Sequence, residues 1–306
     1  MGNINFVSVL SQHINFYDFI PNTTKDKKEQ KIYYFCYRNN FPIPLLNGAT
    51  NDISWGCMIR TGQMMICETL QRIEKIRNKV KNIPELFFDD PSASFSIHNI
   101  TMYGAKNNIA VGNWFSPTAL SLTLEQLVNN NSIVSDHVNL LLSRDGIVYG
   151  NKVNEILDSD KCCLLLVPVM FGMEDINQLY YHQIKQLLQH KSSAGFIGGK
   201  QKKSLYLSSI QNDKVEYFDP HVIKPAFLSL DDDNQSNILS GFIELADLNS
   251  SMLLCFLIKS KEEFDEWYNE ITAIDNAIVC IEEEEKERKE ENQDRYTDSD
   301  DVISFE

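Results

Sequence analysis

The sequence predicts an α+β fold in which a long helix packs on a mostly antiparallel sheet. Three observations support this. Apolar residues recur near helical spacing from Cys57 to about Lys79, and a continuous apolar strand runs from Cys163 to Val169. Two further apolar segments flank Asn212-Asp213, a pair typical of a hairpin turn. With 306 residues, 43% of them hydrophobic, the chain can form one large domain, or one domain that carries a smaller appendage.

The first third of the chain leads up to the long helix. Residues 1–31 are predicted to be an N-terminal arm whose second part is a polar loop. Ile32–Arg38 is rich in Tyr and Phe and is predicted to be a strand. Phe41–Ser54 contains two prolines and a glycine, which indicate a loop.

The middle of the chain alternates helices and strands. A helix is expected over Thr118–Val128, because Ser116 is a favoured N-cap and Pro117 suits the first helical position. Residues 129–160 are polar and rich in Asn, and they give no clear prediction. An amphipathic helix is expected over Asp175–His190.

The last third is predicted to begin with a flexible loop over Gly195–Ser204. The other expected elements are strands at Leu205–Ile210, Val215–Phe218 and Met252–Ile258, and a final helix at Glu262–Ile281. Residues 282–306 are dominated by Glu and Asp and are predicted to be disordered. The expected folded domain is therefore 32–281.

Charge and cysteine content limit the classes of partner and cofactor. A formal net charge of −15 repels nucleic acid and anionic membranes, so neither is an expected direct partner. The seven cysteines are scattered without a CxxC pair, which argues against a disulfide framework or a zinc site. No signal peptide is evident, and the longest apolar run, Cys162–Met173, is too short to span a bilayer. We expect a cytoplasmic monomer without metal, cofactor or stable membrane insertion.

Cys57 is the strongest candidate for chemistry. It lies in the segment Ser54–Arg60, directly after Trp55-Gly56, at the predicted start of the long helix. The positive end of the helix dipole favours the thiolate there, and the thiolate is the nucleophilic form. The other cysteines, such as Cys67 inside the helix, are interpreted as packing residues.

Asp219 and His221 are the candidate partners of that thiol. In an extended segment, side chains at i and i+2 point to the same side, so the carboxylate can orient the imidazole. The alternative is an Asp-Pro turn beside a surface histidine. His98 is interpreted as a core histidine, and His182 and His190 as residues on the solvated part of a helix.

Trp114 permits two interpretations, a buried core residue or a lid over a groove. Gly198-Gly199-Lys200 resembles part of a phosphate loop, but Ala194 stands where the first glycine would be and Gln201 follows the lysine. A phosphate site is therefore not expected.

Several segments occur in a specific order between Tyr33 and Trp267 and together resemble the autophagin family, the autophagy-related protein 4 cysteine endopeptidases. They are Tyr37-Arg38-Asn39-Asn40-Phe41, Trp55-Gly56-Cys57-Met58-Ile59-Arg60-Thr61-Gly62-Gln63-Met64, Gly112-Asn113-Trp114-Phe115-Ser116-Pro117, Gly198-Gly199-Lys200 and Phe218-Asp219-Pro220-His221. The resemblance implies a papain-like cysteine protease fold with a small inserted subdomain.

The resemblance also implies roles for individual residues. Cys57 would be the nucleophile, His221 the general base and acid, and Asp219 the orienting carboxylate. Tyr37 would supply a hydroxyl to the oxyanion hole, together with the Cys57 backbone N–H. Trp114 would gate the substrate channel.

The residues Lys200, Gln201, Lys202 and Lys203 would form the flexible loop that lifts when substrate enters. Relatives commonly have Pro and small polar residues after the Gly-Lys pair, so this loop departs from the family pattern. Ser54 is a second, milder departure, because the family usually has Gly there.

The implied substrate is the ubiquitin-like autophagy-related protein 8, free and linked to phosphatidylethanolamine. Cleavage after its C-terminal Gly would prime it for lipidation and release it from the lipid. Two alternatives stay open. One is a protease-like scaffold that binds the modifier without cleaving it, and the other is a peptidase for a different ubiquitin-like protein.

Overall fold

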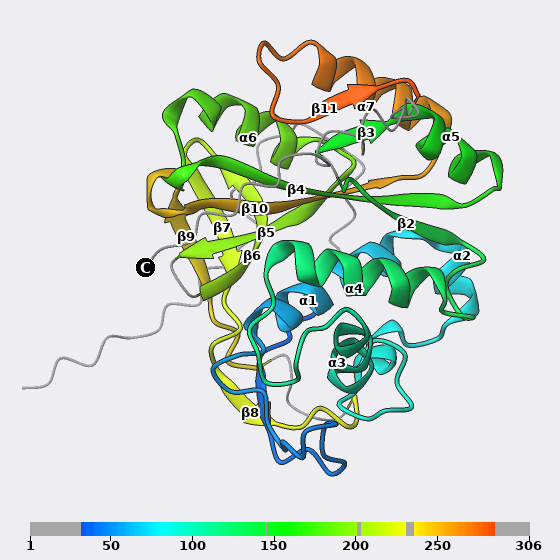
Figure 1. Cartoon of the computed structure of the whole chain (residues 1–306), viewed down its shortest axis with the longest axis vertical. Helices are drawn as coiled ribbons and strands as arrows, with labels where there is room; N and C mark the ends of the chain where they lie inside the picture. The colour runs from blue at the N-terminus through cyan, green and yellow to red at the C-terminus, as the bar shows by residue number, and fades with distance from the viewer. Residues whose placement is uncertain (1–31, 145, 201–202, 231–235, 285–306) are drawn as a thin grey trace, which may run out of the picture. The chain divides into compact units, whose positions relative to one another are not determined.

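A computed structural model describes residues 32–144, 146–200, 203–230 and 236–284 (Figure 1). The predicted arm, residues 1–31, and the acidic segment from residue 285 lie outside the described residues. Among the described residues, no helix has both the length and the apolar character needed to cross a bilayer.

The centre of the fold is a seven-stranded sheet. Its neighbouring strands are antiparallel except for β2 and β4, which run parallel, so the predicted mostly antiparallel sheet is confirmed. In spatial order the strands are β2 (Val138–Leu142), β4 (Cys162–Asp175), β10 (Asn249–Ile258), β5 (Ser193–Lys200), β6 (Lys203–Gln211), β7 (Lys214–Phe218) and β9 (Ser240–Glu244).

Helices cover both faces of this sheet, and strand periodicity explains how. Successive residues of a strand point to opposite faces, so Leu164 and Leu166 of β4 join one core while Leu165 and Val167 join the other. Helices α1 (Cys57–Arg72) and α4 (Pro117–Asn129) cover the first face. Helices α5 (Gly150–Asp158), α6 (Tyr181–Gln189) and α7 (Lys261–Thr272) cover the second (Figure 1).

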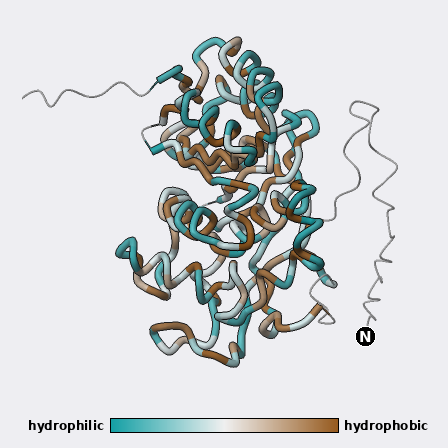
Figure 2. The backbone as a smooth tube through the Cα atoms, turned by 90° about the vertical axis from the view of Figure 1, so that its right-hand side faces the viewer, coloured by the Kyte–Doolittle hydropathy of each residue, from teal (hydrophilic) through white to brown (hydrophobic). Residues whose placement is uncertain are grey.

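Shorter elements complete the fold, and hydrophobic segments run through its interior (Figure 2). Strands β1 (Tyr37–Asn39) and β8 (Ile223–Pro225) form a parallel pair, as do β11 (Cys280–Glu282) and β3 (Ile147–Tyr149). The remaining elements are α2 (Glu74–Lys79), α3 (Ile97–Lys106), and the 3-10 helices η2 (Ile83–Phe87), η3 (Gln178–Tyr180) and η4 (Leu245–Asp247).

Several predicted elements agree with the structure. Ser116 caps α4, with its side chain accepting a hydrogen bond from the Ala119 N–H. The hairpin at Asn212 joins β6 and β7, and Asn212 has the positive φ of 57° that such turns need. The long helix begins at Cys57 as predicted, but it breaks at Ile73, whose extended backbone separates α1 from α2.

Other predicted element boundaries are wrong, and sheet pairing explains two of them. The expected strand Ile32–Arg38 is reduced to β1, because within the described residues only Tyr37–Asn39 pairs with another strand there. The helix expected from Asp175 starts at Tyr181, since β4 continues to Asp175 along β10. The final helix ends at Thr272, and β11 follows.

The expected flexible loop at Gly195–Ser204 is also wrong, because this segment contains most of β5 and the start of β6. Its glycines permit close backbone contact. A Cβ atom at Gly199 would lie 1.9 Å from the Lys203 carbonyl oxygen on the paired strand. No local sequence pattern indicated α3, β2, β3 or α5.

Candidate active site

Cys57 is the first residue of α1 and its side chain is fully buried. Gly56 is the N-cap and offers no side chain to the free N–H groups of the first turn. A Cβ atom at Gly56 would lie 2.3 Å from Asp52 Oδ2, so only glycine fits before the cysteine. The thiol therefore lies at the positive end of the helix dipole, as the sequence indicated.

His221 and Asp219 follow the end of β7 and point toward each other. One Asp219 oxygen, Oδ1, accepts a hydrogen bond from the His221 backbone N–H at 2.9 Å and also contacts His221 Nδ1. The segment is held from two sides, because the Tyr37 N–H donates to the Pro220 carbonyl and the Tyr34 hydroxyl donates to the Asp219 carbonyl. The imidazole is thus fixed by contacts to its own segment and to β1.

Two aromatic side chains surround the thiol. Trp114 Nε1 donates a hydrogen bond to Cys57 Sγ at 3.2 Å, while 45% of the residue stays exposed to solvent. Trp114 is therefore not a buried core residue, and its role as a lid stays a prediction. The Tyr37 ring meets the His221 ring edge-on, with centroids 5.2 Å apart, and Tyr37 is one of the residues that lower the pKa of Cys57.

The electrostatics of the site favour charge separation between sulfur and imidazole. Burial raises the pKa of Cys57, but interactions with His221, the Ser204 backbone, Trp114 and Tyr37 outweigh it and lower that pKa below its ordinary value. Burial lowers the pKa of His221, yet its contact with Asp219 and the nearby Cys57 outweigh burial and raise that pKa to about 9. Both shifts favour transfer of the thiol proton to the imidazole, so the site favours the thiolate–imidazolium form of the pair.

Comparison with known proteins places this site in a family. The peptidase C54 catalytic domain family matches residues 22–270. The chain belongs to the peptidase C54 family. The resemblance to the autophagin cysteine endopeptidases predicted from the motifs is confirmed, because relatives named cysteine protease ATG4 match in several species. The mixed helices and sheet form the expected papain-like α+β cysteine protease fold.

Three of these relatives show the extent of similarity. Cysteine protease ATG4 of Kluyveromyces marxianus is 31% identical over 232 residues, covering 70% of this chain and 51% of the relative. The Medicago truncatula protein of the same name is 29% identical, covering 78% and 57%. Probable cysteine protease ATG4 of Kluyveromyces lactis is 28% identical, covering 82% and 61%. The chain thus spans about half to three fifths of the length of these relatives.

The predicted gating segment of this C54 domain lies at the β5–β6 connection. Lys200 is the last residue of β5, and Lys203 is the first residue of β6. The Nζ atom of Lys200 lies 3.8 Å from Asp247 Oδ2. Gln201 and Lys202 lie outside the described residues. Ser204, which follows directly, was missed by sequence reasoning, although its backbone contributes to lowering the pKa of Cys57 and its hydroxyl lies 2.9 Å from Thr61 Oγ1.

The remaining histidine predictions have mixed outcomes. His98 is buried with Nε2 2.6 Å from the Ile43 carbonyl oxygen, so the core interpretation is confirmed. The placement of His190 on the solvated part of a helix is wrong. It is buried, and its Nδ1 accepts the Ser192 N–H at 3.0 Å. Within the described ranges, no group of three or more His, Cys, Asp or Glu side chains could hold a metal ion.

Proposed function

We propose that the protein is a cysteine endopeptidase that cleaves after the C-terminal Gly of the ubiquitin-like autophagy-related protein 8. The substrates are the precursor of this modifier and its phosphatidylethanolamine-linked form. The observation that carries the proposal is the arrangement of a thiol, an imidazole and a carboxylate from Cys57, His221 and Asp219, brought together from distant parts of the chain. Membership of the C54 family supports the choice of substrate.

The reaction follows from this arrangement. The Cys57 thiolate attacks the carbonyl carbon of the terminal Gly, and the resulting oxyanion receives hydrogen bonds from the Tyr37 hydroxyl and the Cys57 backbone N–H. When the tetrahedral intermediate collapses, the C–N bond breaks and His221 Nε2 gives its proton to the leaving amine. A thioester remains on Cys57.

Hydrolysis of the thioester completes the cycle. The neutral His221 takes a proton from water, and the hydroxide formed attacks the thioester carbonyl. The C–S bond breaks, which releases the modifier with a free Gly carboxyl group and restores the thiolate–imidazolium pair. The carboxyl group then loses its proton to solvent. Asp219 holds His221 Nδ1 throughout, so Nε2 stays directed at the reacting atoms.

Substrate entry requires the lid to move. Cys57 is fully buried and Trp114 contacts its sulfur, so the carbonyl carbon of a substrate cannot reach it in this arrangement. Displacement of Trp114 and of the Lys200–Lys203 connection would open a narrow channel. A channel of that width would accept Gly and exclude residues with side chains. We further propose a cytoplasmic monomer that acts without cofactor or metal.

The test is cleavage of the modifier carrying a C-terminal extension, measured by mass spectrometry of the intact protein. The parent should release the extension after Gly, and Cys57→Ala should not. Cys67→Ala is the matched control, because Cys67 is a buried cysteine farther along the same helix. Its rate should stay close to that of the parent.

A second substrate tests the lipid-linked form. Vesicles carrying the modifier on phosphatidylethanolamine should release it into the supernatant after incubation with the parent. Binding of the modifier without release of either product would favour a non-cleaving scaffold. Cleavage by Cys57→Ala would refute the nucleophile assignment.

A further inference from the structure

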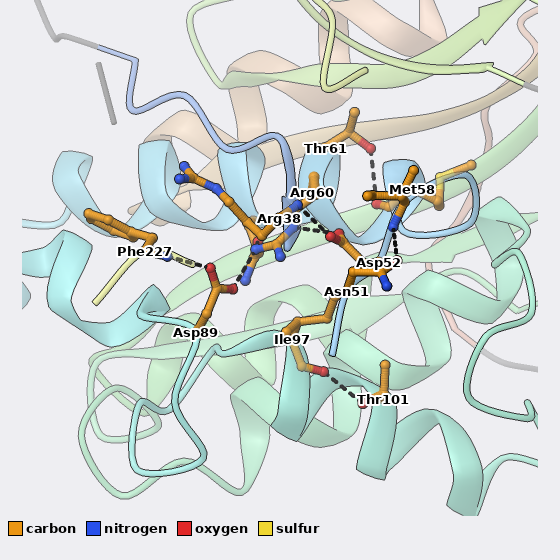
Figure 3. Close-up of polar contacts among 12 residues, drawn as sticks. Arg38, Asn51, Asp52, Met58, Arg60, Thr61, Asp89, Ile97, Thr101 and Phe227 are labelled. Atoms are coloured by element: carbon orange, nitrogen blue, oxygen red, sulfur yellow. Dashed lines mark hydrogen bonds and ion pairs between the residues drawn. The ribbon is translucent and has the colours of Figure 1, made fainter. Parts of the chain in front are cut away.

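Two buried carboxylates share a single arginine beneath the start of α1 (Figure 3). Arg60 Nε donates to Asp52 Oδ2 at 2.7 Å, and Arg60 Nη1 donates to Asp89 Oδ1 at 2.8 Å. All three residues are fully buried. Burial lowers the pKa of Arg60, but the two carboxylates outweigh it and raise that pKa, so the guanidinium is charged at every relevant pH.

The second oxygen of each carboxylate accepts a backbone N–H. Asp52 Oδ1 accepts the Arg38 N–H at 2.6 Å, and Asp89 Oδ2 accepts the Phe227 N–H at 2.8 Å. The two aspartates therefore match in burial, in their shared cation and in the use of both oxygens. They differ in the backbone they hold, because Arg38 directly follows Tyr37 and Phe227 lies beyond β8.

Asp52 also joins β1 to α1 through its own main chain. Its N–H donates to the Arg38 carbonyl at 3.2 Å, and its carbonyl accepts the Gly56 N–H at 2.9 Å. Its side chain packs where a Cβ atom of Gly56 would be. One residue thus contacts the neighbour of Tyr37, the neighbour of Cys57, and the arginine one turn into α1.

We propose that Asp52 is a positioning residue that fixes the Tyr37 hydroxyl relative to the Cys57 sulfur and backbone N–H. The inference rests on the proposed function, since it assigns Tyr37 to the oxyanion hole. Hydrogen bonds of defined length hold β1 against the helix start, whereas apolar packing alone leaves the distance less constrained. Small displacements of an oxyanion donor carry a large rate cost.

The experiment is a double-mutant cycle between Asp52→Asn and Tyr37→Phe. Asn keeps an acceptor for the Arg38 N–H but removes the charge that Arg60 contacts. We expect Asp52→Asn to lower kcat for modifier cleavage by about 10-fold. This is less than the roughly 100-fold loss expected when one oxyanion donor is removed, because the Tyr37 hydroxyl is displaced but still present. In the Tyr37→Phe background the same change should cost less than about 2-fold, because the group it positions is already absent.

Two further measurements separate positioning from general loss of structure. Alkylation of Cys57 by iodoacetamide needs the thiolate but no oxyanion hole. Tyr37 makes the smallest of the contributions that lower the Cys57 pKa, so Asp52→Asn should leave the alkylation rate within about 2-fold of the parent. Asp89→Asn is the matched control. It should lower the melting temperature by a similar amount, and its effect on kcat should be the same in the parent and in the Tyr37→Phe background, because Asp89 holds a different segment.

Equal effects of Asp52→Asn in both backgrounds, or a parallel loss of alkylation, would overturn the inference. If Asp52→Asn does not fold, Arg60→Lys replaces it, because Lys keeps the charge but cannot reach both carboxylates through separate nitrogens. The same coupling with Tyr37→Phe is expected.

A parent that fails to cleave the modifier refutes the proposed function separately. In that case the double-mutant cycle is measured by binding instead of cleavage. The ligand is a short peptide aldehyde ending in glycinal, because the oxygen of its adduct with Cys57 enters the oxyanion hole.

Discussion

The two faces of the central sheet bury different kinds of side chain. The side covered by α1 contains an apolar core and, in addition, the buried ion-pair cluster of Arg60, Asp52 and Asp89, and it adjoins the thiol. The side covered by α5, α6 and α7 is filled mainly by apolar side chains, among them Trp267 and Phe256, whose rings lie 5.4 Å apart. One side of the molecule therefore combines apolar packing with buried, directional polar contacts, and the other relies largely on apolar packing.

The difference follows from what each face must hold. Apolar contacts are strong but non-directional, and they are sufficient to keep α6 and α7 on the sheet. The catalytic face must fix a helix start, strand β1 and the segment after β7 in one precise arrangement. Hydrogen bonds and ion pairs have defined lengths and angles, so buried polar groups suit that task despite their desolvation cost.

The largest expected effect on activity comes from Asp219→Asn on the catalytic face. Loss of the carboxylate should lower kcat by roughly 10²–10⁴-fold, the range for general acid–base catalysis. It should also change the pH profile. In the parent, the high-pH limb of kcat/KM should lie near the His221 pKa of about 9, because the imidazolium is lost above it. Without Asp219 the imidazolium is less stable, so that limb should move to lower pH. If the high-pH limb does not move in Asp219→Asn, Asp219 does not stabilise the His221 imidazolium.

A smaller effect is expected from Tyr37→Phe, which removes one oxyanion donor and keeps the ring against His221. The cleavage rate should fall by about 100-fold. Tyr206→Phe is the control, because the Tyr206 hydroxyl donates to the Ala194 carbonyl and is also buried. It should cost stability with little change in rate. Similar rates for Tyr37→Phe and the parent would show that the hydroxyl has no part in the reaction.

The smallest effect on activity is expected on the opposite face. Leu254→Ala opens a cavity in the second core and should reduce the free energy of unfolding by about 2–5 kcal/mol. Measured well below the melting temperature, kcat should stay within about 2-fold of the parent. A large fall in kcat for the folded variant would break the comparison, because it would show that apolar packing on this face also sets the geometry of the site.

Local patterns in the sequence were sufficient for several features. Cys57 was found from the Gly-Cys pair at a helix start, and Asp219 with His221 from their spacing of two. Ser116 and Asn212 marked a cap and a turn, because caps and turns depend on a few neighbouring residues. Their chemistry is encoded within a few positions, so the sequence alone determined them.

Contacts between distant segments were decided only by the tertiary structure. No local pattern predicts that Arg60 and its two aspartates are buried together, because charged residues are usually at the surface. The strand nature of Gly195–Lys200 depends on pairing with β10 and β6, which no local pattern shows. The sheet and α1 bring Cys57 and His221 together from distant parts of the chain, and the free energy that holds them there comes from burial and pairing of the whole domain.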